Sequence, residues 1–297
     1  MSAEDAPLHF QQLHIDVARN ATDDFNPFHD KRRWRNVVSN PFPGPIVLGF
    51  QLECLIEQQM RLFREARGET ELIGREALRF SNYEFRFVNA VSAGEALDIV
   101  IKASRFKQGE EATLANRISL KADGRLAVTG YKRESRAPLV APALVPGDLG
   151  NLNEAPDRSF LGDTGLFLKR KFMTTSNAKN FLSSSLVEQA DYIDELADRV
   201  QFPEIFPCAL ISCALLERAQ QQGHDFEREP MVYKSHSISI DREQLQQLRS
   251  NDRLHLLSRH SDPVAATPVY DCFGIVGADR LLFSGRIELM PLAPEVG

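Results

Sequence analysis

One apolar stretch decides how this chain folds: Pro45-Ile46-Val47-Leu48-Gly49-Phe50-Gln51-Leu52-Glu53-Cys54-Leu55-Ile56-Glu57. Its large apolar residues recur at helical spacing as Leu48, Leu52, Leu55 and Ile56, followed by Phe63. Proline stands at the helix entrance, where its missing N–H does no harm. The stretch therefore predicts a long, buried helix.

The same kind of stretch returns later in the chain as Pro207-Cys208-Ala209-Leu210-Ile211-Ser212-Cys213-Ala214-Leu215-Leu216-Glu217. Two downstream segments also find a match, in the same order. Glu95–Val100 resembles Asp252–Leu257, and Arg125–Gly130 resembles Arg280–Gly285. The preserved order indicates an internal duplication.

Each copy of the helix is followed by segments that read as strands. In the first copy Leu114, Ile118 and Leu120 alternate with polar or small residues, and Asp123-Gly124 supplies a hairpin turn. In the second copy the strands are 269–276 and 281–289, with Gly277-Ala278-Asp279 between them. An antiparallel sheet must cover its apolar face, and the helix is the obvious cover. We expect an α+β fold of the hot-dog type, and two copies make a double hot dog.

The clearest break in the chain lies in its middle. Residues 137–165 are rich in proline and glycine and lose all periodicity, which predicts a long, extended linker on the surface. The 297 residues suffice for two domains of ordinary size. We therefore expect a first hot-dog repeat at 1–136, the linker at 137–165, and a second repeat at 166–297.

Composition excludes several classes of protein. A formal charge of -6 does not favour sequence-blind binding to nucleic acid. No apolar run is long enough to span a membrane, and the polar start Met1–Pro7 is not a secretory signal. The four cysteines fit neither a zinc site nor a disulfide framework. These observations predict a cytoplasmic protein with reduced, buried thiols.

A short motif before the first helix carries the chemistry. It reads Asp24-Phe25-Asn26-Pro27-Phe28-His29. Asn-Pro marks a turn, because the residue before proline avoids the helical conformation. A tight turn can bring the Asp24 carboxylate and the His29 imidazole to the same side, where they form a general acid–base pair able to activate one water.

This motif, followed by Pro45–Gly49, resembles the hydratase-2 motif of MaoC-like dehydratases, the R-specific enoyl-CoA hydratases. The segment Tyr83–Glu95 also resembles a strand and turn of that family. The resemblance implies a hydro-lyase of fatty-acid metabolism. Such an enzyme adds water to a trans-2-enoyl thioester to give the (R)-3-hydroxyacyl thioester, or runs the reverse dehydration, without metal or redox cofactor.

The resemblance also implies roles for single residues. Asp24 and His29 would be the catalytic pair, with Asp24 favoured as the base and His29 as its acid partner, although coupled groups leave that division open. Asn26 would shape the loop and hydrogen-bond within the site. Gly49 would offer its backbone N–H to the thioester oxygen, and its place near a helix start suits a developing negative charge.

A run of cations, Lys31-Arg32-Arg33-Trp34-Arg35, follows the motif closely. Arg32 and Arg33 are candidates for binding phosphate groups of coenzyme A or of an acyl-carrier protein. A solvated charge run is an equally good interpretation. His236, His255 and His260 lack metal-ligand spacing, which favours structural or surface roles.

The second copy lacks the motif. The corresponding segment, 174–185, contains no Asp–His pair, and Ile211 stands near the position equivalent to Gly49. We expect the first repeat to carry catalysis and the second to line the acyl tunnel and replace a homodimer partner. The exposed edges of the sheet also allow two chains to pair as a homodimer.

Two other functions remain open from the sequence. A hot-dog thioesterase would use a helix carboxylate, and Glu53 and Glu57 are the candidates. That function leaves the Asp24–His29 loop unexplained. A non-catalytic acyl-thioester-binding module is suggested by the degenerate second copy and by Leu48, which stands where the family often has histidine.

Overall fold

The computed structural model describes residues 7–262 and 267–292. The start of the chain, for which we predicted no secretory signal, lies largely outside these described residues. None of the helices in the described ranges is long and apolar enough to cross a membrane.

The elements follow one another in two similar series. The first series contains α1 (Gln12–Thr22), α2 (Gly49–Glu65), α3 (Glu69–Arg75), β1 (Phe80–Phe87), β2 (Leu97–Ile101), β3 (Arg105–Lys107), β4 (Thr113–Ala122) and β5 (Arg125–Ser135). The second contains β6 (Ser159–Phe160), β7 (Phe167–Phe172), α4 (Thr175–Ser184), β8 (Ile193–Asp194), β9 (Arg199–Val200), α5 (Ile205–Ala209), α6 (Ile211–Gln221), β10 (Met231–Asp241), α7 (Arg242–Gln246), β11 (Arg253–His260), β12 (Val269–Val276) and β13 (Arg280–Pro291).

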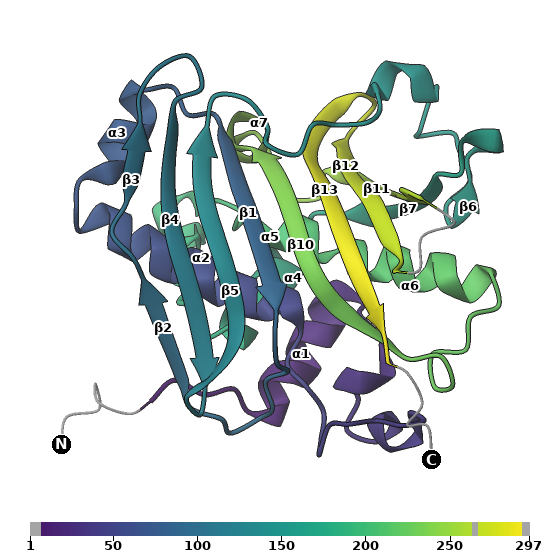
Figure 1. Ribbon diagram of the computed structural model, residues 1–297. Coiled ribbons are helices and arrows are strands. Elements are labelled where there is room, and N and C mark those ends of the chain that lie inside the picture. Colours follow the sequence, from purple (N-terminus) through teal and green to yellow (C-terminus); the bar gives the residue numbers. More distant parts are fainter. Residues whose placement is uncertain (1–6, 263–266, 293–297) are drawn as a thin grey trace.

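Eleven of these strands form one antiparallel sheet in the order β2-β4-β5-β1-β10-β13-β12-β11-β7-β6, with β3 paired to β4 (Figure 1). Its centre is the pair β1–β10, which runs from Phe80 opposite Asp241 to Arg86 opposite Ser235. Outward from this pair, each side repeats the same sequence of strands: β1, β5, β4, β2 on one side and β10, β13, β12, β11 on the other. The repetition found in the sequence is thus a repetition of topology.

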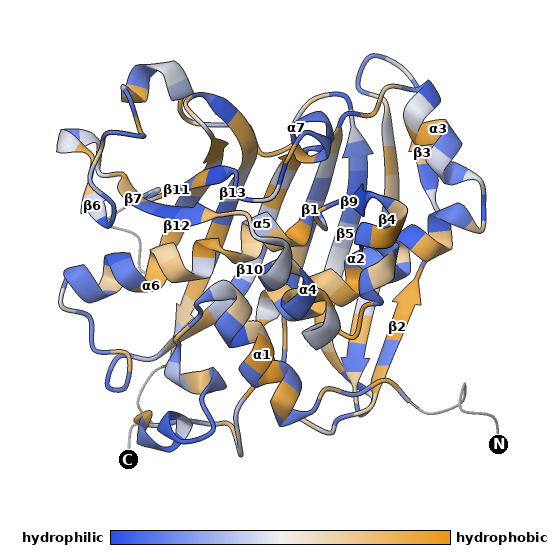
Figure 2. Ribbon diagram, turned by 180° about the vertical axis from the view of Figure 1, so that it is seen from behind, coloured by the Kyte–Doolittle hydropathy of each residue, from blue (hydrophilic) through white to orange (hydrophobic). Residues whose placement is uncertain are grey.

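The helices lie across one face of this sheet, as Figure 2 shows from behind. Most of α2 is buried, including Phe50, Leu55 and Ile56. One continuous core joins both sides and includes Tyr83 of β1, Phe206 of α5 and Ile238 of β10. Because one core serves both repeats, the apolar surface of each half is covered partly by the other.

The predicted hairpin between β4 and β5 is confirmed. Asp123 and Gly124 have φ values of 47° and 76°, both in the left-handed region that a two-residue hairpin turn needs. Behind the turn, Gly130 of β5 allows a close approach of two strands. A Cβ there would lie 1.9 Å from the backbone oxygen of Glu84, so no other residue fits without moving the strand.

The prediction of a proline at each helix entrance is wrong for Pro45 and holds for Pro207. Pro45 precedes α2 by four residues, and the extended segment after it forms a bridge between Ile46 and Ser92. Pro207 lies inside α5, in the first turn, where a missing N–H is tolerated. The second helix therefore begins earlier than the sequence match suggested, at Ile205, and breaks at Leu210 before α6.

Residues 137–165 cross the sheet on the side away from the helices. The backbone N–H of Val140 donates to Ser239 Oγ at 2.8 Å, and Ser284 Oγ donates to the backbone oxygen of Val140 at 2.6 Å. Leu152 is fully buried against Leu257 and other apolar residues. This stretch is therefore packed against the sheet at these points, and is not simply extended on the surface. The division into repeats at 1–136 and 166–297 stays a prediction.

Candidate active site

The motif loop follows α1 and is shaped by its own side chains. Asp24 Oδ1 accepts a hydrogen bond from the backbone N–H of Asn26 at 3.1 Å. Asn26 Oδ1 in turn accepts the N–H of Phe28 at 3.1 Å and caps the short 3-10 helix Pro27–His29. Asn26 thus makes the local bond expected of it, and the turn places Asp24 and His29 on the same side.

The two side chains of the predicted catalytic pair face each other in a buried place. His29 Nε2 lies 3.9 Å from Asp24 Oδ2, and the side chains are only 7% and 3% exposed. This separation is too long for a direct hydrogen bond. One small molecule such as water could contact both atoms.

The tautomer of His29 follows from its second contact. Its Nδ1 lies 2.7 Å from the backbone oxygen of Ile46. A carbonyl oxygen only accepts, so Nδ1 carries the proton and Nε2 of the neutral ring is an acceptor. Burial lowers the pKa of His29, with the Asp24 carboxylate acting in the opposite direction. The neutral ring therefore presents a lone pair toward Asp24.

Gly49 is the first residue of α2. Its N–H has no acceptor within the helix, because the first four amides of a helix lack a partner carbonyl. A Cβ at this position would lie 3.0 Å from Phe87 Cζ and 3.3 Å from Tyr233 Cδ2. Glycine therefore lets two aromatic rings pack directly against the start of the helix.

A cavity of about 280 Å³ brings these residues together. Asp24, Asn26, His29 and Gly49 all line it. The rest of the wall comes from both repeats and is mostly apolar. From the second repeat it includes Ser212, Leu215, Leu216, Ala219, Phe226, Met231, Val232, Tyr233, Tyr270, Leu289, Met290 and Leu292.

Two polar lining residues were missed by the sequence reasoning. Ser212 Oγ of α6 and Tyr233 OH of β10 lie 2.8 Å apart and hydrogen-bond to each other. Burial and the Asp24 carboxylate raise the pKa of Tyr233 well above its ordinary value, so the phenol stays protonated. A single tyrosine within a strand carries no motif, and only the pairing of β10 with β1 brings it to the cavity.

Arg32 and Arg33 lie outside the cavity. Both are exposed, and Arg33 forms an ion pair of 3.0 Å with Glu227. Among the described residues Arg32 has no acidic partner within ion-pair distance. Of the two arginines, Arg32 is therefore the one whose guanidinium is not already paired within the described residues.

Behind Gly49 lies a buried contact between a carboxyl group and an imidazole that the sequence did not predict. Glu53 Oε1 of α2 is 2.9 Å from His236 Nδ1 of β10, and both side chains are fully buried. Phe50 stacks on the His236 ring at 4.5 Å between centroids. His236 thus has a structural role, one of the two that the sequence left open. Glu53, a carboxylate proposed for a thioesterase, does not line the cavity.

The second candidate carboxylate, Glu57, lies at the start of the other helix. Its Oε1 accepts the N–H of Glu204 at 2.9 Å, and its Oε2 accepts the N–H of Ile205 at 3.0 Å. Since Ile205 is the first residue of α5, it occupies the place that Gly49 has in α2. The prediction that Ile211 stands near the glycine position is therefore wrong by about two turns.

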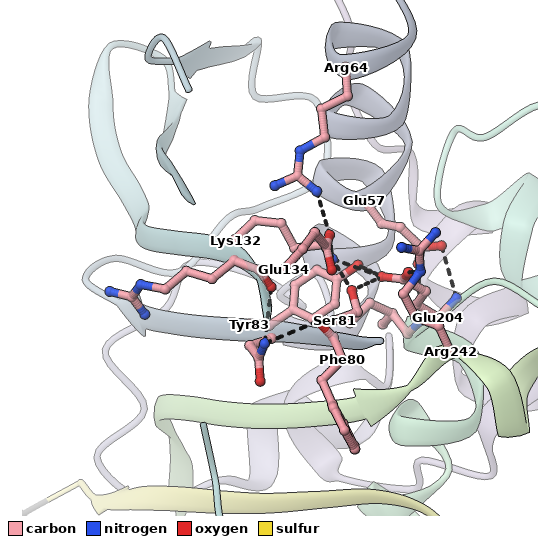
Figure 3. A network of polar contacts seen from close by, with 12 residues as sticks. Glu57, Arg64, Phe80, Ser81, Tyr83, Lys132, Glu134, Glu204 and Arg242 are labelled. Atoms are coloured by element: carbon pink, nitrogen blue, oxygen red, sulfur yellow. Dashed lines mark hydrogen bonds and ion pairs between the residues drawn. The ribbon is translucent and has the colours of Figure 1, made fainter. Parts of the chain in front are cut away.

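Figure 3 shows the polar network that surrounds Glu57. Glu204 accepts from Tyr83 OH at 2.6 Å and lies 3.0 Å from Lys132 Nζ, which also pairs with Glu134 at 2.7 Å. Arg64 of α2 pairs with Glu134. Burial and the Glu204 carboxylate raise the pKa of Glu57 to about 8, whereas Lys132 and Arg242 hold that of Glu204 at about 2 against the effect of burial.

Within the described residues the cysteines form neither a disulfide nor part of a metal site. Cys54, Cys208, Cys213 and Cys272 are buried and unpaired, as predicted. Within the described parts of the chain, no three His, Cys, Asp or Glu side chains come together in a way that could hold a metal ion.

Comparison with known proteins rests on structure alone, since no protein-family model and no curated sequence matches the chain. A MaoC-like dehydratase matches with a TM-score of 0.60 at 10% identity, over 97% of this chain and 96% of that chain. A conserved hypothetical protein of Mycobacterium tuberculosis, described as having a double hotdog fold, matches with a TM-score of 0.56 at 13% identity, over 97% and 94%. A MaoC-like dehydratase of Phytophthora capsici gives 0.54 at 10%, over 96% and 94%. The predicted double hot-dog fold is confirmed.

Proposed function

We propose that this protein adds water to trans-2-enoyl thioesters to give (R)-3-hydroxyacyl thioesters, or catalyses the reverse dehydration. One observation carries the proposal: Asp24 and His29 face each other across 3.9 Å inside a largely apolar cavity that Gly49 also lines. The MaoC-like dehydratases among the structural neighbours support the same class of reaction.

The pair is arranged to activate one water. A water between them would donate one hydrogen bond to His29 Nε2 and the other to the Asp24 carboxylate. The lone pairs of the water oxygen then point toward a substrate. His29 Nε2 takes the proton as the oxygen adds to the β-carbon, and Asp24 stabilises the imidazolium. The same nitrogen then returns a proton to the α-carbon. This assignment makes His29 the base, in place of the Asp24 that the sequence favoured.

The negative charge that forms during addition moves to the thioester oxygen. The free N–H of Gly49 at the positive end of α2 is placed to stabilise it. No ionised side chain except Asp24 lines the described wall of the cavity, so this amide acts in a medium of low polarity, where a fixed donor is most effective.

The second repeat supplies structure where the first supplies chemistry. The counterpart of the motif loop follows α4 and is 185–204, not the predicted 174–185, because Thr175–Ser184 form the helix itself. Residues 185–204 contain no histidine. Helix α6 and strand β10 instead line the cavity.

The substrate carrier is coenzyme A or an acyl-carrier protein, and Arg32 is the better placed of the two arginines to meet its phosphate.

The test is the absorbance of the enoyl band of crotonyl-CoA with the purified protein. Loss of the band without free thiol supports hydration. Release of free thiol would indicate a thioesterase and contradict the proposal. No change with crotonyl-CoA and with longer trans-2-enoyl-CoA would indicate a binding module and contradict it as well.

A further inference from the structure

The cavity contains a pair of hydroxyl groups, and both come from the second repeat. Ser212 of α6 and Tyr233 of β10 line it, and their oxygens lie 2.8 Å apart. Neither hydroxyl makes a hydrogen bond to any other residue in the described ranges. The two groups carry two hydrogens and share one bond, so one hydrogen of the pair has no acceptor in the described part of the protein.

A β-bulge turns Tyr233 toward the helices. His236 and Ile238 of β10 are buried, and strict alternation along the strand would place Lys234 on their side of the sheet. The pairing of β10 with β13 changes register between Tyr233 and Ser235, which inserts one residue into β10. Tyr233 therefore takes the inner position and Lys234 is exposed. Bulges often redirect a side chain next to a site in this way.

The ring of Tyr233 lies against the residue that offers the amide donor. A Cβ on Gly49 would be 3.3 Å from Tyr233 Cδ2. Phe50 and His236 flank the same ring, with centroids 5.8 Å and 4.4 Å from its own. The ring is thus held in place, and its hydroxyl enters the cavity beside the start of α2.

Of the atoms that take part in the proposed reaction, the thioester oxygen best suits a neutral donor. The water must keep its lone pairs for the β-carbon, so a hydrogen bond donated to the water would slow its attack. The thioester oxygen gains negative charge during addition and is stabilised by donors. Burial and the Asp24 carboxylate raise the pKa of Tyr233 well above its ordinary value, so the phenol keeps its proton for this purpose.

We infer that Tyr233 donates a second hydrogen bond to the thioester oxygen, beside that of the Gly49 N–H, while Ser212 Oγ donates to the phenolic oxygen. Accepting this bond makes the phenol a stronger donor. Tyr233 is then a catalytic residue, and Ser212 is a positioning residue. The inference rests on the proposed function for the place of the thioester. It goes beyond that function because the repeat without the motif also contacts the reacting group.

The first experiment compares two ligands of the full-length protein by calorimetry. Butanoyl-CoA has the thioester oxygen, and its thioether analogue S-butyl-CoA lacks it. Tyr233→Phe removes the hydroxyl and keeps the ring. It should weaken butanoyl-CoA about 3–10-fold, as expected for one hydrogen bond, and leave S-butyl-CoA within about twofold.

A role of Tyr233 in packing alone would weaken both ligands alike and would overturn the inference. No change for either ligand would overturn it as well, and so would a wild-type protein that binds both analogues equally or binds neither.

The second experiment measures the kinetics of crotonyl-CoA hydration. Tyr233→Phe should lower kcat about 10–100-fold and change KM less than about threefold, because the oxygen carries more charge in the transition state than in the bound substrate. Ser212→Ala should lower kcat less. The double variant should be no worse than Tyr233→Phe, since Ser212 acts through Tyr233.

Tyr192→Phe is the matched control. It also removes a buried phenol of the second repeat, but the Tyr192 hydroxyl donates to Glu57 at 3.2 Å and does not line the cavity. Its kcat should equal that of the wild type. Equal losses of kcat in Tyr192→Phe and Tyr233→Phe would contradict the inference.

The outcome separates the two proposals. Loss of the thioester preference in Tyr233→Phe, without hydration of any enoyl thioester by the wild type, would support the contact and contradict the hydratase. Hydration by the wild type, with preference and kcat unchanged in Tyr233→Phe, would do the opposite.

Discussion

The starts of α2 and α5–α6 occupy equivalent places in the two repeats but have opposite surroundings. At α2 Gly49 lines a cavity, and Asp24 and His29 of the motif loop line it too. At α5 the N–H groups of Glu204 and Ile205 are already bound by the carboxylate of Glu57. The first N–H groups of a helix lack a carbonyl acceptor within it. The difference teaches that a protein side chain satisfies one helix start and leaves the other for a ligand.

The largest effect on catalysis should come from the start of α2, which we call the open helix start because no side chain caps it. Asp24→Asn and His29→Ala should each lower kcat for enoyl-CoA hydration by about 10²–10⁴-fold, because each removes one of the two groups that activate the water. The double variant should be little worse than the singles, since the pair acts as a unit. Circular dichroism checks that the fold is kept. More than a tenth of wild-type kcat in both single variants would contradict the assignment.

The start of α5 is the filled helix start, because Glu57 binds it. Substitutions around it should change the stability of the protein and not its catalysis. Lys132→Met leaves Arg242, at 3.7 Å, as the cation paired with Glu204 among the described residues. It should lower the free energy of unfolding by about 3–5 kcal/mol, with kcat of the folded protein unchanged. Urea unfolding and initial rates measure the two. Lys107→Met is the control, because the Lys107–Glu111 pair is exposed and should change stability by less than about 1 kcal/mol. A loss of kcat at unchanged stability would reverse the comparison.

Adding one methyl group to the open start tests the amide donor. Gly49→Ala should lower kcat about 10–100-fold, since the new Cβ must displace Phe87 or Tyr233 and shifts the N–H from its position. Gly74→Ala in α3 meets no atom within 4 Å and should leave kcat unaltered. Equal rates for both variants would remove Gly49 from the mechanism.

The carboxylate that fills the second start should make stability depend on pH. The folded-state pKa of Glu57 is about 8, above its ordinary value of 4.5. The folded chain therefore binds the proton more tightly than the unfolded chain, and the free energy of unfolding should fall as pH rises from about 5 to about 8.5, by at most about 1.4 kcal/mol per pH unit. In Glu57→Gln this slope should flatten. Urea unfolding across the window checks the sign, and a slope that survives the substitution would refute it.

The smallest effect should come from the surface beside the motif loop. Arg32→Ala should raise KM for acyl-CoA by up to about fivefold, the size expected of an exposed ion pair. Arg33→Ala should do less, because Glu227 already pairs with Arg33. Thioesters of N-acetylcysteamine, which lack the phosphates, should show no change with either variant. An equal rise for both carriers would assign Arg32 a role other than phosphate contact.

Local signals in the sequence predicted the open helix start well. Apolar spacing located α2, and the Asn-Pro turn within the motif predicted that Asp24 and His29 would meet. Both depend on contacts within a few residues. The second helix was misplaced because its residues are apolar on every side, so periodicity could not set its first residue.

The residues that the sequence missed depend on pairing between distant segments. Tyr233 reaches Gly49 only because β10 pairs with β1, and Glu57 reaches Ile205 across 148 positions of the chain. Glu53 and Glu57 therefore looked like free helix carboxylates, whereas each is bound to the opposite repeat.

Joining both hot dogs in one polypeptide removes a constraint that symmetric dimers obey. In a homodimer every substitution occurs twice, so a glutamate at position 57 would occupy both helix starts at once. Here a single glutamate accepts the N–H of Ile205 at the start of α5, while no side chain caps the start of α2. Covalent linkage thus permits the two halves to specialise independently, one residue at a time.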